Sequence, residues 1–271
     1  MEKELFKCKV FTPMFCYGAD VKTPELRAPS LKGALRYWWR AIHPNISKGE
    51  LKKEEAKMFG GENDNKAEKS SFSIQITNIK KNEKEIQALP HKHLFTKKAL
   101  MPDSTFEIII RPQNEEIRNL LILTSILGGI GARSRRGFGC FQIGTDYGEQ
   151  FNFTLNEENI LKLILSINPS FEMKKEYNRK YPYLQKVEIG KPIEDYNELL
   201  QKIGQASHKF DTPYTGSVIN GRYASPIYVS IYKENGYYFP IISTLKRTID
   251  DISNNDEEIK NNFIQAILGG E

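Results

Sequence analysis

The pattern of apolar and polar positions along the chain predicts a mixture of strands and helices. Apolar and polar residues alternate over three segments, as they do in half-buried strands. Two other segments repeat apolar residues at helical spacing, and a short strand is expected just after the second of them. In chain order these segments are strand 5–11, helix 30–42, strand 71–79, strand 105–111, helix 117–127 and strand 138–143.

This order of elements predicts a ferredoxin-like, or RNA-recognition-type, module over residues 1–150. The module has an insertion at about 44–70, between its first helix and its second strand. Lysines and acidic residues are equally numerous over 47–70, so a solvated helix and loop are expected there rather than a binding face.

The second half, residues 151–271, repeats this plan less regularly. The segment Lys233-Glu-Asn-Gly236 joins two strand patterns and is typical of a hairpin turn. The sequence Ile-Leu-Gly-Gly closes an apolar helix at 126–129 and again at 267–270. The predicted fold class is therefore α+β, with two ferredoxin-like modules in tandem. The elements expected in the second half are helices 155–167, 193–207 and 256–268 and strands 226–232 and 237–243.

Composition adds a mildly basic charge and few other constraints. The 271 residues are 39% hydrophobic and carry a net charge of +5, which suits a folded protein and favours no single partner. No apolar run approaches the roughly 18 residues that span a bilayer, so no membrane association is expected. The isolated cysteines fit a reducing compartment. We therefore predict a cytoplasmic protein. The cysteines also lack the paired spacing of a metal site, and no metal or other cofactor is expected.

The segment 128–139 is the most informative one in the chain. Four of its glycines, at 129, 131, 137 and 139, surround Arg133, Arg135 and Arg136, and no acidic residue occurs from Gly128 to Thr145. Glycine lets a backbone approach a ligand closely, and arginine donates bidentate hydrogen bonds to phosphate. The segment therefore suits a polyanion, although a glycine helix cap followed by a solvated basic turn explains the same residues.

A second basic segment, 23–40, begins the first predicted helix. Ser30 is expected to cap this helix, and its apolar positions form one core face. Beside that face, Lys32, Arg36 and Arg40 form a basic stripe with Trp39 at its border. The stripe is either a binding surface for an anion, helped by the positive helix N-terminus, or the solvated side of an ordinary amphipathic helix.

The remaining candidates carry less information. His91 and His93 could form a metal-binding or an acid–base pair, but no third ligand follows at a recognisable spacing, and a loop with two exposed histidines is the favoured explanation. Arg222 and Tyr223 lie in a glycine-rich stretch and could contact phosphate and stack on a base, or simply belong to a surface hairpin. No motif for catalysis is present, so the protein is predicted not to be an enzyme.

Several of these segments together resemble one family. The glycine-arginine loop resembles that of the RAMP superfamily of CRISPR proteins. The segment 24–41, Pro-Glu-Leu-Arg-Ala-Pro-Ser-Leu-Lys-Gly-Ala-Leu-Arg-Tyr-Trp-Trp-Arg-Ala, looks like the hallmark of the first-numbered subunits of type III-B (Cmr) effector complexes. Segments 11–15, 58–61 and 222–228 match the same family in order.

This resemblance implies a non-catalytic subunit that binds RNA. Its expected partners are guide (CRISPR) RNA, which it would contact in the 3′ region, target RNA, and other RAMP subunits of the Cmr complex. It would help hold the guide–target duplex in antiviral defence. The residues carried over as RNA contacts are Arg27, Lys32, Arg36, Trp39, Arg40, Arg133, Arg135, Arg136, Arg222 and Tyr223.

A guide-processing endoribonuclease of the same superfamily is the alternative. Those enzymes resemble this chain in fold and employ a histidine as acid–base. Their glycine-rich loop commonly lies near the C-terminus, whereas here it lies in the middle of the chain, which counts against this alternative.

Overall fold

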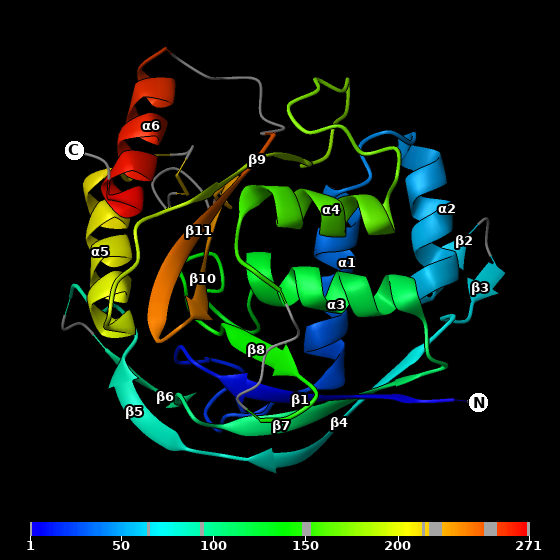
Figure 1. Ribbon diagram of the computed structural model, residues 1–271, viewed down its shortest axis with the longest axis horizontal. Helices are drawn as coiled ribbons and strands as arrows, with labels where there is room; N and C mark the ends of the chain where they lie inside the picture. Colours follow the sequence, from blue (N-terminus) through cyan, green and yellow to red (C-terminus); the bar gives the residue numbers. More distant parts are fainter. Residues whose placement is uncertain are drawn as a thin grey trace.

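The structure is a computed structural model that combines six helices with small antiparallel sheets (Figure 1). It describes residues 2–63, 66–92, 95–147, 153–212, 215–216, 224–246 and 254–269. The helices are α1 (Ala28–Ala41), α2 (Lys48–Phe59), α3 (Glu115–Leu127), α4 (Glu157–Ile167), α5 (Tyr196–Lys209) and α6 (Asn254–Leu268). The strands are β1 (Glu4–Val10), β2 (Gly61–Asn63), β3 (Lys66–Glu68), β4 (Ser73–Lys80), β5 (Glu83–Gln87), β6 (Thr96–Leu100), β7 (Thr105–Arg111), β8 (Phe141–Gly144), β9 (Leu184–Ile189), β10 (Ile227–Glu234) and β11 (Tyr237–Leu245).

The first half forms a four-stranded sheet in the order β4-β7-β1-β8, in which every neighbouring pair is antiparallel. Phe6, Cys8 and Val10 of β1 are buried, whereas Leu5, Lys7 and Lys9 between them reach solvent. This is the alternation that the sequence predicted. α1 and α3 contact each other and cover the buried face of the sheet (Figure 1).

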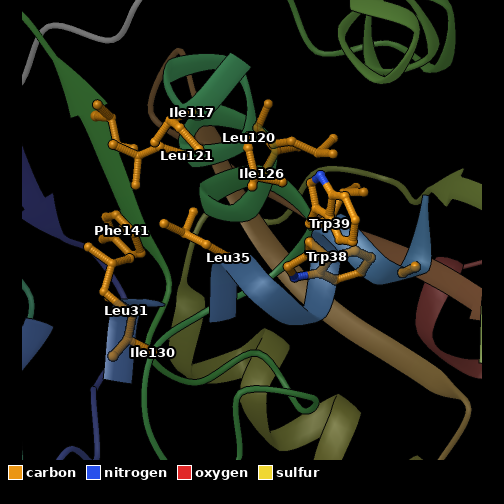
Figure 2. Close-up of a cluster of buried hydrophobic side chains, with 14 of the residues drawn as sticks. Leu31, Leu35, Trp38, Trp39, Ile117, Leu120, Leu121, Ile126, Ile130 and Phe141 are labelled. Carbon is orange, nitrogen blue, oxygen red and sulfur yellow. The ribbon is translucent and has the colours of Figure 1, made fainter. Parts of the chain in front are cut away.

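The main core lies between α1, α3 and this sheet (Figure 2). The four apolar positions predicted to face it from α1 are confirmed, since none is more than 1% exposed. Gly128 ends α3 against the Trp38 indole: a Cβ on this glycine would lie 2.4 Å from Nε1. The α1 residues in the core are Leu31, Leu35, Trp38 and Ile42, which follows the helix C-terminus.

The second half forms a three-stranded antiparallel sheet in the order β10-β11-β9, with α5 and α6 side by side against it (Figure 1). Asn235 and Gly236 both have positive φ and form the predicted hairpin turn. The two largest clusters of buried side chains each draw residues from both halves. A mixed helix and strand fold is confirmed, but the two tandem modules remain a prediction, and the boundary at 150 lies outside the described residues.

Two local predictions are wrong. The first helix begins at Ala28 rather than after Ser30. Arg27 takes the N-cap position without a side-chain cap, because Pro29 already fixes a helical φ in the first turn. The eighth strand begins at Phe141 rather than at 138, because Gly137 and Gly139 have positive φ and keep the chain out of extended conformation.

Three strands went unpredicted outside the insertion. β5 and β6 form a hairpin whose residues are mostly charged and exposed, so they lack the alternation on which prediction depends. β9 pairs with the edge of the second sheet. Within the insertion, the expected helix is α2, and the expected loop contains the short pair β2–β3.

Candidate nucleic-acid interface

The glycine-arginine loop connects α3 to β8 and is bound to its own protein along much of its backbone. The amide of Gly137 donates to the carbonyl of Val229 on β10 at 2.8 Å, and the amide of Val229 donates to the carbonyl of Arg135 at 3.1 Å. On the other side, the amide of Ala132 donates to the carbonyl of Phe15. The loop therefore joins the two halves of the chain.

The glycines of this loop are explained by packing. Gly131, Gly137 and Gly139 have φ values of 97°, 79° and 72°, which favour glycine. A Cβ on Gly131 would lie 2.4 Å from the carbonyl oxygen of Phe15, and one on Gly139 would lie 2.0 Å from that of Ile130. The sequence predicted that these glycines let a ligand approach the backbone. In the structure they instead let other segments of the same protein approach it closely.

Arg136 and Arg135 donate inward to main-chain carbonyls. Arg136 Nη1 donates to the carbonyl oxygens of Arg135 at 2.7 Å and Ile227 at 3.1 Å, and Nη2 donates to that of Thr215. Burial, with repulsion from the neighbouring arginines, lowers the pKa of Arg136 to about 10, so it stays charged at neutral pH. No carboxylate among the described residues pairs with it.

Arg135 donates a hydrogen bond to the main chain and also lies over two aromatic rings. Its Nη1 donates to the carbonyl oxygen of Ser225 at 2.7 Å. Its guanidinium carbon lies 5.3 Å from the ring centre of Tyr37 on α1 and 5.9 Å from that of Tyr228 on β10. These contacts place the loop directly beside α1.

Arg133 differs from the other two arginines. Within the described part of the chain its half-buried guanidinium has neither a hydrogen bond nor an ion pair, and burial lowers its pKa. Gly131 and Ala132 beside it are exposed. A ligand can therefore approach the loop at 131–133.

The basic stripe of α1 divides into two parts. Arg36 and Arg40 both pair with Glu55 of α2, at 3.2 and 3.4 Å. Arg36 also donates to the carbonyl oxygen of Gly60 at 2.7 Å. These two cations hold the insertion against α1, whereas Lys32, one turn earlier, donates to the hydroxyl of Ser70 at 2.7 Å and has no carboxylate partner in the described residues.

Trp39 lies in the core rather than at the border of the stripe. It is 3% exposed, and its ring lies 4.2 Å from that of His43 and 6.1 Å from that of Phe59. The insertion covers this side of α1, which the helical pattern alone could not reveal. Stacking of Trp39 on a base is therefore not available in this conformation.

Lys32 borders a surface hollow of about 860 Å³ where α1 begins. Lys69 and Arg111 are two further basic residues that line it, together with Ser70, Ser71 and Ser73. Arg111 donates to the side-chain oxygen of Gln75 at 3.1 Å, and Lys69 is exposed. The hollow is lined by Ala28, Pro29, Lys32, Lys69, Ser70, Ser71, Phe72, Ser73, Ile74, Arg111 and Pro112, without a single carboxylate.

Two electrostatic observations agree with an excess of positive charge here among the described residues. α2, α3, α4 and α5 each have an acidic residue in the first turn, and α1 has none. Burial and repulsion from Arg36 lower the pKa of Lys32. An anion in this hollow would relieve that repulsion and complement the helix dipole. Lys69 and Arg111 were missed in the sequence because they lie far from the α1 segment along the chain.

The three remaining residues predicted to contact RNA are Arg27, Arg222 and Tyr223. Arg27 is exposed at the start of α1, with Glu25 at 3.6 Å. Arg222 and Tyr223 lie outside the described residues. Of the predicted contacts, Lys32 therefore borders the hollow at the start of α1, and Arg133 and Arg135 belong to the loop beside this helix.

Two of the histidines form a separate cluster, His91 on the β5–β6 loop and His208 on α5. The rings of His91 and His208 stack with centres 5.8 Å apart, and Lys92 Nζ lies 3.0 Å from His208 Nδ1. Burial, then the charges of Lys92, His208 and Arg133, lower the pKa of His91. His93 lies outside the described residues. Nowhere in the described part of the chain, this cluster included, do three histidine, cysteine or acidic side chains converge as a metal site would require. No described helix is long and apolar enough to cross a membrane.

The chain thus combines a mixed fold of helices and antiparallel sheets with a hollow lined by basic residues. The RAMP superfamily model matches residues 7–142, half of the chain, so this chain belongs to the RAMP superfamily. A segment of 65 residues is 38% identical to the CRISPR system Cmr subunit Cmr1-2 of Pyrococcus furiosus, covering 22% of this chain and 34% of that protein. A segment of 138 residues is 28% identical to Cmr1-1 of the same organism, covering 44% and 41%. Each match thus spans less than half of the relative's length.

Solved structures extend the likeness to nearly the whole fold. The apo crystal structure of Cmr1 from Pyrococcus furiosus aligns with a TM-score of 0.63 at 20% identity, covering 98% of this chain and 96% of that one. A chain from the type III-B Cmr-beta complex bound to cognate target RNA aligns with a TM-score of 0.58 at 12% identity, covering 98% and 100%. The resemblance to the first-numbered Cmr subunits, expected from the sequence, is confirmed.

Proposed function

We propose that this protein is a non-catalytic RNA-binding subunit of a type III-B CRISPR effector complex. It contacts the 3′ region of the guide RNA and helps hold the guide–target duplex beside other Cmr subunits. The similarity to Cmr1 proteins and the RAMP membership support this assignment. The RNA contacts are to phosphates rather than to base edges, because a guide-binding protein must accept any sequence.

The hollow at the start of α1 is the observation that carries the proposal. Lys32, Lys69 and Arg111 meet there without a carboxylate. In contrast, Arg36 and Arg40 on the same helix are satisfied by Glu55. Cations left unpaired at a concave surface favour a polyanion, and a single strand follows such a groove through its phosphates.

The test is binding of a labelled single-stranded RNA over a salt series. If about six phosphates are neutralised, log affinity falls with log salt with a slope of roughly −4. Replacing Lys32, Lys69 and Arg111 together by alanine should flatten this slope by about 2, which corresponds to three lost phosphate contacts. An unchanged slope would exclude the hollow as the RNA site.

A matched control removes three charges from elsewhere. Lys162, Lys175 and Lys186 of the second half are exposed and pair with Glu158, Glu172 and Glu188. Their triple alanine variant has the same net charge as the hollow variant. It should retain the wild-type slope to within about one contact, or 0.7.

One observation favours the endoribonuclease alternative, and it uses different residues. A histidine pair with a nearby lysine, as in His91, His208 and Lys92, is able to transfer protons at a phosphodiester. Incubating the protein with repeat RNA tests this directly. Site-specific cleavage that is lost on His91→Ala or His208→Ala would show that the protein is an endoribonuclease rather than a non-catalytic binding subunit.

A further inference from the structure

Gly33 stands inside a helix, at an exposed position, with no structural need for glycine. It is the sixth of the fourteen residues of α1, and a Cβ there would meet nothing within 4 Å. Glycine inside a helix costs about 1 kcal/mol relative to alanine. In contrast, the space beside Gly204 inside α5 is occupied, because a Cβ there would lie 2.4 Å from His91 Nδ1.

The surroundings of Gly33 are basic and connect the two candidate regions. Pro29, which lines the hollow, lies one turn before Gly33 on the same face of α1, and Tyr37 lies one turn after it. The Tyr37 ring in turn contacts the guanidinium of Arg135 in the glycine-arginine loop. Of the three cations of α1, Lys32 has no carboxylate partner among the described residues, whereas Arg36 and Arg40 pair with Glu55, so an anion is favoured at the Lys32 end of this face.

From these observations we propose that the sugar–phosphate backbone of a single RNA strand crosses α1 in contact with Gly33. The strand passes from the hollow at Lys32, Lys69 and Arg111 toward the glycine-arginine loop. Pro29 and Tyr37 are eight residues apart, so the crossing along the helix is about 12 Å long. This inference rests on the proposed RNA-binding function and specifies the route of the strand.

The missing side chain is the reason that the strand can lie against the helix. Without a Cβ at position 33, a ribose or phosphate can reach the helix surface and remain within hydrogen-bonding distance of Lys32. A leucine there would push the strand outward by the length of its side chain. The direct hydrogen bonds to phosphate would then be lost, while the longer-range attraction of the cations would persist.

Substitutions at Gly33 separate this role from a structural one, because the two predict opposite effects. Gly33→Ala should raise Tm by about 2–4 °C, since it removes the helix penalty of glycine. Gly33→Leu should fold as stably as the wild type and weaken binding of a labelled 20-nucleotide oligouridylate by about tenfold, or 1.4 kcal/mol. Gly33→Ala should fall between the wild type and Gly33→Leu in affinity.

Gly49 of α2 provides the matched control. It is also exposed and helical, and a Cβ there would likewise meet nothing within 4 Å. Gly49→Leu should bind the oligouridylate within twofold of the wild type. If Gly33→Leu also binds within twofold, the route over α1 is wrong although RNA binding stands. If the wild type itself fails to bind at low salt, the proposed function fails, and the route fails with it.

Discussion

Replacing Arg136 should destabilise the fold rather than only weaken RNA binding. The guanidinium donates three hydrogen bonds to the carbonyl oxygens of Arg135, Ile227 and Thr215, and lies over the ring of Phe263 at 5.3 Å. Ile227 and Phe263 belong to the second half of the chain. Arg136 therefore fastens the glycine-arginine loop to β10 and α6.

The size of the effect follows from these contacts. A hydrogen bond from a charged group contributes about 1.5–3 kcal/mol. Water can replace part of this at a half-buried site, so Arg136→Ala should lower the free energy of unfolding by about 2–4 kcal/mol. That is a large share of the 5–15 kcal/mol typical of a folded domain.

Urea denaturation followed by tryptophan fluorescence measures this loss, because Trp38 and Trp39 are both buried. The urea midpoint should fall by about 1 M for Arg136→Ala. Arg133→Ala is the control: Arg133 has no hydrogen bond or ion pair among the described residues, so its midpoint should hardly change. A loss below about 1 kcal/mol for Arg136→Ala would refute the structural role, and RNA binding would then be the better explanation of this arginine.

Three further outcomes are expected. Gly139→Ala should destabilise by at least about 2 kcal/mol in the same assay, because its φ is 72° and its new Cβ would lie 2.0 Å from the carbonyl oxygen of Ile130; a change below 0.5 kcal/mol would contradict this. Burial lowers the pKa of His43 although its ring bonds to the carbonyl of Trp39. The unfolded state therefore takes up the proton first, and the free energy of unfolding should fall as pH drops below about 6.5. A His43→Gln variant with an equally steep pH dependence would show that another group is responsible. A thiol-specific reagent should label the native protein far more slowly than the urea-unfolded protein, and rapid native labelling would contradict the raised pKa values of the buried thiols. These thiols are Cys8, Cys16 and Cys140.

Much of the site could be found in the sequence, but not the state of its residues. The glycine-arginine loop and the α1 segment are local features, and the structure has the loop between a helix and a strand and the segment at the start of a helix, as predicted. The partners of their side chains were not predictable, because Glu55, Ser225 and Thr215 are distant in sequence. From the sequence alone, Arg36 and Arg136 are therefore predicted to be free cations. The structure shows instead that Arg36 pairs with Glu55 and that Arg136 donates to the carbonyl oxygen of Thr215.

The sequence by itself determined the helices and the regularly alternating strands, because hydrophobic periodicity and turn residues act between near neighbours. The strand–helix order of the first half, the core face of α1 and the Asn235–Gly236 turn all followed from it. Only the tertiary structure decided which cations remain available to a ligand. Lys32, Lys69 and Arg111 meet because β4 begins and β7 ends beside the start of α1, whereas the insertion brings Glu55 to Arg36 and Arg40. Charge compensation depends on distance in space, and that distance is set by packing between segments that lie far apart in the chain.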